Sequence, residues 1–206
     1  MIKRDSTWQE FPPENLDLSR FPKRTVSKGR SWYREHGILG PWYFASGDGG
    51  RFNLETPRGS LYLASTPQAA ARERIGWDLA KSGRVPYSLV EGRQVATLNL
   101  PATLRLAKLT APDAVHWQLI PNELTTMPNY AVPRAWAAAF DQQHFDGLWV
   151  MLRTGTPDTR GIVWFGKSGT RDWGAAAEMP LLEILRSIEI RIVGPPSSTQ
   201  LTIVTA

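Results

Sequence analysis

The stretch from Gly49 to Trp77 constrains the fold most, because it carries the signals of a glycine-rich loop, a short strand and a capped helix in direct succession. Residues 60–65 alternate in character, which is typical of a strand and turns Tyr62 away from the leucines on either side of it. Thr66 and the proline after it form a typical helix start, with the hydroxyl as cap and proline at the first helical position. The helix is expected to end near Gly83.

Glu73 falls on this expected helix almost opposite the apolar stripe marked by Ile75 and Leu79. A single glutamate on a helix is ordinarily a solvated surface residue. Here its neighbours are three small residues and one large aromatic, which favours a carboxylate that lines a cleft open to a flat ligand. These neighbours are Ala69, Gly76, Ala80 and Trp77.

The rest of the chain predicts further strands and short helices. No element is assigned to residues 110–133, and residues 181–193 fit either a helix or a strand, with a strand favoured from Ser187 onward. The other expected elements are a strand and a corner within 31–44, one or two strands within 94–109, a short helix at 135–140, strands at 148–152 and 162–165, and an edge strand in the tail 201–206.

A length of 206 residues fits a single domain, which we place at residues 31–206, after a basic extension over residues 1–30. The extension has several prolines and no sustained period, so it is expected to lie over the domain or to stay mobile. Residues 1–34 hold eight Lys or Arg against four Asp or Glu, which is most of the net charge of +5. A basic arm can bind nucleic acid through phosphates, but an acidic protein partner or a solvated segment explains it equally well, and we do not expect direct nucleic-acid binding.

Several kinds of chemistry are excluded or unsupported. Cysteine is absent, which excludes disulfides, thiol catalysis and a cysteine-ligated zinc. The three histidines stand apart in no ligand spacing, so no metal is expected, and the G-x-S-x-G motif of serine hydrolases is missing. No apolar run is long enough to span a membrane and the start lacks the apolar centre of a secretory signal, so we expect a cytoplasmic protein without membrane contact.

One sequence match to a known motif is not expected to have the motif's structure. Gly161 to Ser168 fits the phosphate-loop pattern G-x-x-x-x-G-K-[ST]. The four middle positions are bulky and apolar, which predicts a strand instead of a loop of phosphate-binding amides. We therefore interpret the match as chance.

Four side chains that remain, Arg34, Arg51, Tyr62 and Glu73, suit a dinucleotide with a labile glycosidic bond. An arginine fork binds a pyrophosphate, a tyrosine ring stacks on a nicotinamide, and a carboxylate stabilises the oxocarbenium-like state as nicotinamide leaves. The glycines around Gly50 can bring backbone amides close to a phosphate. The alternative is that the arginines are surface cations and the tyrosine is a core aromatic.

The runs at 50–53, 61–64 and 69–73, with Trp32-Tyr-Arg34 upstream and Phe145-Asp-Gly-Leu148 downstream, resemble the RES domain family. The resemblance implies an α+β fold similar to that of ADP-ribosyltransferase toxins, with mixed β-sheets and flanking helices. It also implies a toxin of a bacterial toxin–antitoxin pair, which degrades NAD by hydrolysis or phosphorolysis. The usual partner in the family is an antitoxin with a helix-turn-helix DNA-binding part, which blocks the active site.

The family takes its name from a characteristic arginine, glutamate and serine, and the serine is the one that this chain lacks. Its position holds Leu152, which can neither donate to a phosphate nor order a water. Thr154 lies two positions on, where the alternation of a strand would keep it on the same face, so it is a candidate substitute. The resemblance implies Arg34, Tyr62 and Glu73 as catalytic residues and Arg51 as a substrate-binding residue. Gly50, from the glycine-rich loop, and Thr154, as the candidate substitute for the serine, are the other expected substrate-binding residues.

The replaced serine leaves alternatives beside NAD cleavage. One is an ADP-ribosyltransferase that acts on a protein. Another is a non-catalytic module of the same fold, which binds NAD or a partner without turnover.

Overall fold

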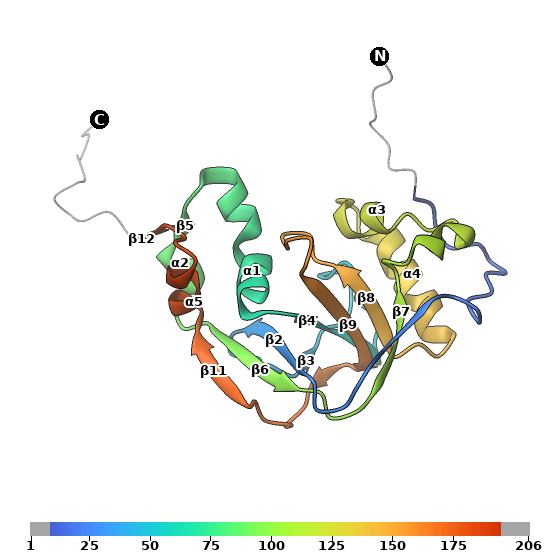
Figure 1. Ribbon diagram of the computed structural model, residues 1–206, viewed down its shortest axis with the longest axis horizontal. Coiled ribbons are helices and arrows are strands. Elements are labelled where there is room, and N and C mark those ends of the chain that lie inside the picture. The colour runs from blue at the N-terminus through green and yellow to red at the C-terminus, as the bar shows by residue number, and fades with distance from the viewer. Residues whose placement is uncertain (1–8, 195–206) are drawn as a thin grey trace, which may run out of the picture.

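The computed structural model describes residues 9–194, which form a curved sheet of eight strands with smaller elements around it (Figure 1). The strand order is β1-β7-β8-β9-β4-β2-β6-β11, and a two-stranded pair is formed by β3 with β10 and another by β5 with β12. The bounds are β1 Lys23–Val26, β2 Ser31–His36, β3 Tyr43–Phe44, β4 Arg58–Ala64, α1 Pro67–Ser82, β5 Val85–Pro86, α2 Tyr87–Val90, β6 Gln94–Asn99, β7 Leu104–Lys108, the 3-10 helix η1 Pro112–Trp117, α3 Pro121–Thr126, α4 Ala131–Gln142, β8 Gly147–Met151, β9 Arg160–Lys167, β10 Gly169–Thr170, β11 Ala177–Pro180, α5 Leu181–Ser187 and β12 Ile192–Val193.

The eight-stranded sheet is mixed, because β7 and β8 run parallel while its other neighbouring strands run antiparallel. Together with the flanking helices this confirms the predicted α+β class. The phosphate-loop match lies almost entirely within β9, where each residue from Gly161 to Lys167 pairs with β4. It is therefore strand, as predicted.

β4 and α1 follow the local signals closely. Leu61 and Leu63 are buried on one face of β4, and Tyr62 packs on the other face. The amide of Ala69 donates to the Thr66 hydroxyl at 3.1 Å, which caps the start of α1. The helix ends at Gly83, which adopts a left-handed φ of 65° that glycine tolerates best.

The helices cover one face of the sheet as two separate groups. On one side α1 and α5 bury Ile75 and Leu185 against β6, and on the other α4 buries Trp136 and Phe140 against β8. Figure 1 shows α1 standing apart from α3 and α4, with β4, β8 and β9 between them. The opposite face is closed by aromatic side chains such as Trp42, which pack against the strands. The candidate site lies between the two helix groups.

The described part of the predicted extension lies over the domain. Leu18 and Phe21 are fully buried against α4 and its neighbours, and Phe21 contacts Phe140 edge-on at a ring distance of 4.8 Å. The strand β1 lies at one edge of the main sheet, paired with β7. The boundary at residue 30 stays a prediction. None of the helices within residues 9–194 is long and apolar enough to cross a membrane.

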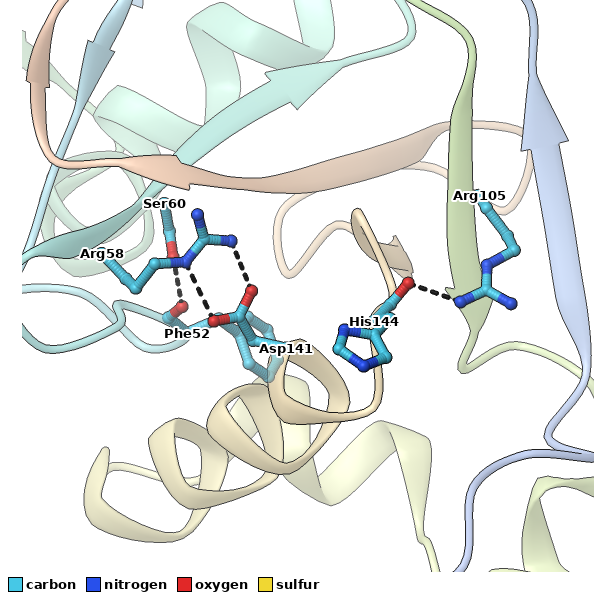
Figure 2. A network of polar contacts seen from close by, with 6 residues as sticks. All are labelled: Phe52, Arg58, Ser60, Arg105, Asp141 and His144. Carbon is cyan, nitrogen blue, oxygen red and sulfur yellow. Dashed lines mark hydrogen bonds and ion pairs between the residues drawn. The ribbon is translucent and has the colours of Figure 1, made fainter.

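Polar contacts tie α4 and the loop before β4 to the sheet (Figure 2). Arg58 of β4 donates twice to the carboxylate of Asp141 on α4, at 3.0 and 2.5 Å. The hydroxyl of Ser60 donates to the carbonyl of Phe52 at 2.7 Å, which fixes the loop that leads into β4. Both contacts hold in place the elements that carry the candidate site.

Most of the other predicted elements are confirmed. The strand and corner within 31–44 are β2 and β3, the segment 94–109 forms β6 and β7, and α4, β8 and β9 lie where a helix and two strands were expected. The strand favoured from Ser187 onward is wrong except for β12, because Ser187 is the last residue of α5, whose apolar side chains pack under α1, and a turn follows at residues 188–189. The tail 201–206 lies outside the described residues.

Candidate functional site

A crevice made of two adjoining hollows lies between α1 and the α3–α4 side of the sheet. The hollows have volumes of about 520 and 510 Å³, each of a size typical of ligand sites. One is lined by Arg51 and the other by Arg34, so each has its own buried or half-buried cation. The residues common to both hollows are Tyr62, Glu73, Val150, Leu152 and Val163.

Glu73 stands where the two hollows meet, and Thr154 holds its carboxylate. The backbone N–H and the hydroxyl of Thr154 both donate to Oε1 of Glu73, at 2.8 and 2.6 Å. The close approach depends on Gly76, one turn further along α1. A β-carbon at position 76 would lie 2.2 Å from Cγ2 of Thr154, which is far inside van der Waals contact. The structure therefore brings Thr154 and Glu73 together as one unit.

Thr154 reaches this position by a different route from the one predicted. β8 ends at Met151, and Thr154 lies in the turn after it, so strand alternation does not place it. Leu152 lines both hollows with an apolar side chain and packs beside the α1–α5 cluster. The crevice wall has no hydroxyl at this position.

Tyr62 is locked by its phenol group. Its hydroxyl accepts from the backbone N–H of Phe52 at 2.8 Å and donates to Oδ1 of Asn53 at 3.0 Å. Burial is the largest influence on the Tyr62 hydroxyl and raises its pKa well above its usual value. The hydroxyl is therefore already engaged and stays protonated, and the ring is the part of Tyr62 that the crevice presents.

Gly50 supports this arrangement without lining either hollow. A β-carbon on Gly50 would lie 2.3 Å from Oδ1 of Asn53, so only glycine leaves room for the side chain that accepts from Tyr62. Asn53 is buried, at 3% exposure, and its backbone N–H donates to the Gly50 carbonyl at 3.2 Å. Gly50, predicted to bind substrate directly, is placed by the structure behind Tyr62.

Arg51 lines the first hollow and is oriented from two sides. Its Nη1 donates to the carbonyl of Met127, and its guanidinium lies 4.6 Å from the ring centre of Tyr130. Burial lowers the pKa of Arg51, the Tyr130 hydroxyl opposes this, and the cation of Arg153 lowers it further. Two cations close together in a half-buried site favour an anionic ligand.

Arg34 of β2 lines the second hollow and lacks a partner for part of its charge. Its Nη1 is buried and makes no hydrogen bond to any residue in the range 9–194. Burial lowers the pKa of Arg34 from its usual value to about 10, and the nearby Glu35 opposes this only in part. A buried guanidinium with a free donor is an unfavourable arrangement that a bound anion would relieve.

The predicted residues thus come together in one crevice, with the exception of Gly50. The side chain of Trp77, also expected beside Glu73, lies outside what the structure describes. Asn53, Tyr130 and Arg153 were not predicted as site residues. Asn53 stands in the same run as Arg51, whereas Tyr130 falls in the segment that gave no clear sequence pattern.

The crevice can bind an anionic ligand and stabilise a developing positive charge next to Glu73. Within the described part of the chain, no group of three or more His, Asp or Glu side chains is arranged to hold a metal. The expectation of a metal-free reaction stays a prediction.

Comparisons with known proteins give one family and one fold. The model of the RES domain matches residues 24–181. Among solved structures, the chain is similar to the crystal structure of the M. tuberculosis MbcT–MbcA toxin–antitoxin complex, with 19% sequence identity, coverage of 79% of this chain and 90% of that chain, and a TM-score of 0.57. At this identity the likeness shows a shared fold. No curated protein matches the chain by sequence.

Proposed function

The chain belongs to the RES domain family, and from that premise we propose that it cleaves the bond between nicotinamide and ribose in NAD⁺. One observation carries the proposal: Glu73 lies at the junction of two hollows, one lined by Arg34 and the other by Arg51. A dinucleotide has two ends and a doubly charged pyrophosphate between them. A divided crevice with a cation in each part and a carboxylate at the junction suits such a ligand.

Glu73 acts on the ribose carbon at which the bond breaks. The bonding electron pair leaves with nicotinamide, which becomes a neutral ring, and positive charge develops on the ribose. A carboxylate fixed beside that charge stabilises the transition state more than the bound substrate, which is the condition for catalysis. Water or inorganic phosphate then bonds to the ribose carbon and gives up a proton, which completes hydrolysis or phosphorolysis.

The arginines and Tyr62 bind and orient the dinucleotide. The guanidinium groups of Arg34 and Arg51, each of which lines one of the two hollows, bind phosphate oxygens. The ring of Tyr62 lies against the nicotinamide, and its hydroxyl plays no part in proton transfer because it is held by Phe52 and Asn53.

Leu152 favours a second candidate function, a module that binds NAD without turnover. An apolar side chain at this position cannot order a water or hold a phosphate, and it lines both hollows. Binding of NAD by the purified protein with no product under any condition would identify this function.

The proposal extends to the cell. The protein acts in the cytoplasm as a toxin that lowers NAD, and an antitoxin with a helix-turn-helix part holds it inactive by covering the crevice. The support is the family match and the likeness to the solved structure of a toxin–antitoxin complex. Expression of the chain alone is expected to arrest growth and deplete NAD, and expression of Glu73→Ala is expected to do neither.

The direct test follows free nicotinamide after incubation of the purified protein with NAD, with and without phosphate. Wild type is expected to release nicotinamide, and Glu73→Ala is expected to lose nearly all of this activity. Glu183→Ala, an equivalent change on α5 away from the crevice, serves as the matched control and is expected to behave as wild type. Equal rates for wild type and Glu73→Ala would refute the proposal.

A further inference from the structure

We infer that Thr154 is a positioning residue, which fixes the Glu73 carboxylate so that one oxygen faces the reacting bond. The inference rests on the proposed function and adds a residue that acts through Glu73. It also explains how the crevice keeps a hydroxyl group beside Glu73, that of Thr154, although Leu152 lines its wall.

Two donors of Thr154 converge on one oxygen of Glu73. The N–H and the hydroxyl of Thr154 reach Oε1 at 2.8 and 2.6 Å. Hydrogen bonds to a charged acceptor are stronger than neutral ones, and two from the same residue fix the direction of the carboxylate. The other oxygen, Oε2, makes no hydrogen bond to the described residues and is left for the ligand.

Gly76 makes the space for this contact. It lies inside α1, where glycine is unfavourable compared with alanine. Its lack of a side chain is what admits Cγ2 of Thr154, since a β-carbon there would stand 2.2 Å away. Glycine at position 76 therefore allows Thr154 to approach Glu73, although it does not stabilise α1.

Nothing else among the described residues holds Glu73. The side chain is exposed on α1, and without Thr154 it would sample several rotamers. A carboxylate that is held before the substrate binds loses less freedom when the charge develops, and this lowers the barrier to reaction. We call the two hydrogen bonds from Thr154 to Glu73 the clamp. Its removal should therefore lower kcat while KM for NAD changes little.

The test uses substitutions that separate the hydroxyl from the methyl group of Thr154. Thr154→Val removes the hydroxyl and keeps the shape, and it is expected to lower kcat by about tenfold to a hundredfold, with KM within about threefold of wild type. Thr154→Ser keeps the hydroxyl and is expected to retain kcat within about threefold. A Val variant as active as wild type, or a Ser variant as impaired as Val, would overturn the inference.

Gly76 provides an independent test that leaves the hydroxyl in place. Gly76→Ala pushes Cγ2 of Thr154 away from Glu73 and is expected to lower kcat like Thr154→Val. In the double variant Gly76→Ala/Thr154→Ser the clashing methyl is gone, and the next atom, Cβ, lies 3.2 Å from the added carbon. The double variant is expected to recover most of the lost kcat. A loss that the serine fails to rescue would contradict the proposed geometry.

A measurement that needs no turnover separates this inference from the proposed function. The amide proton of Thr154 is expected to resonate downfield in wild type, and to move upfield and exchange faster with solvent in Glu73→Ala. An unchanged amide would overturn the clamp even if nicotinamide release is confirmed. A responsive amide in a protein that releases no nicotinamide would support the clamp and refute the proposed function.

Discussion

Replacement of Arg34 with methionine should make the protein more stable and unable to bind NAD. The guanidinium has a buried Nη1 without a hydrogen-bond partner among the described residues, and burial lowers the pKa of Arg34 from that of a free arginine to about 10. A difference of this size corresponds to about 3 kcal/mol of unfavourable free energy for the charged form in the fold. Methionine has a similar length and no charge to desolvate.

The size of the stability gain in Arg34→Met, and its dependence on pH, follow from the lowered pKa of Arg34. Because the folded-state pKa of Arg34 is lowered, the penalty is fully present below about pH 10 and is lost as the pH rises from about 10 toward the higher pKa of the unfolded state. At neutral pH we expect Arg34→Met to raise the free energy of unfolding by about 1–3 kcal/mol. The gain over wild type should shrink above about pH 10.

Urea denaturation at neutral pH measures the gain in stability, and melting curves with and without NAD measure the loss of NAD binding. NAD should raise the melting temperature of wild type and leave that of Arg34→Met unchanged. Arg30→Met, the same change at an exposed position just before β2, is the control and should alter stability by less than about 0.5 kcal/mol. A variant at Arg34 that is destabilised, or that still binds NAD as wild type does, would refute the reasoning.

Two further predictions concern the framework of the crevice. Gly50→Ala forces a methyl group against Asn53 and should lower the free energy of unfolding by about 1–5 kcal/mol, measured by urea denaturation. Gly49→Ala is the control, because there is open space at the added carbon, and it should be neutral or slightly stabilising. Equal effects of the two substitutions would contradict the close contact between Gly50 and Asn53. The side chains of the ion pair between Arg58 and Asp141 are 44% and 18% exposed. A double-mutant cycle on protein stability should therefore give a coupling free energy of about 0.2–1 kcal/mol. A coupling well above this range would contradict the prediction and show that the pair is shielded from solvent.

The elements that the sequence predicted well are those with local causes. The cap at Thr66 and the left-handed stop at Gly83 act within a few residues of themselves, so the limits of α1 could be predicted without knowledge of its neighbours. Tyr62 was placed correctly by strand alternation for the same reason. The segment 181–193 is largely apolar in its first part and fits two periodicities, and only its packing under α1 makes that part a helix.

The parts of the site that escaped prediction depend on contacts between distant segments. Thr154 and Glu73 are 81 residues apart, and the turn that brings them together begins where β8 ends. The sequence suggested Thr154 through strand alternation, which does not apply to a turn. Tyr130 faces Arg51 from a segment without a clear pattern, so no sequence signal pointed to it.

Glu73 is proposed to act on the bond to nicotinamide in a crevice that the arginines allow NAD to enter. The most direct measurement compares NAD binding by calorimetry with nicotinamide release for wild type, Glu73→Ala and Arg34→Met. We predict that Glu73→Ala still binds NAD but no longer releases nicotinamide, and that Arg34→Met loses both. Release that persists in Glu73→Ala, or NAD binding that is unaffected by the loss of Arg34, would contradict these roles.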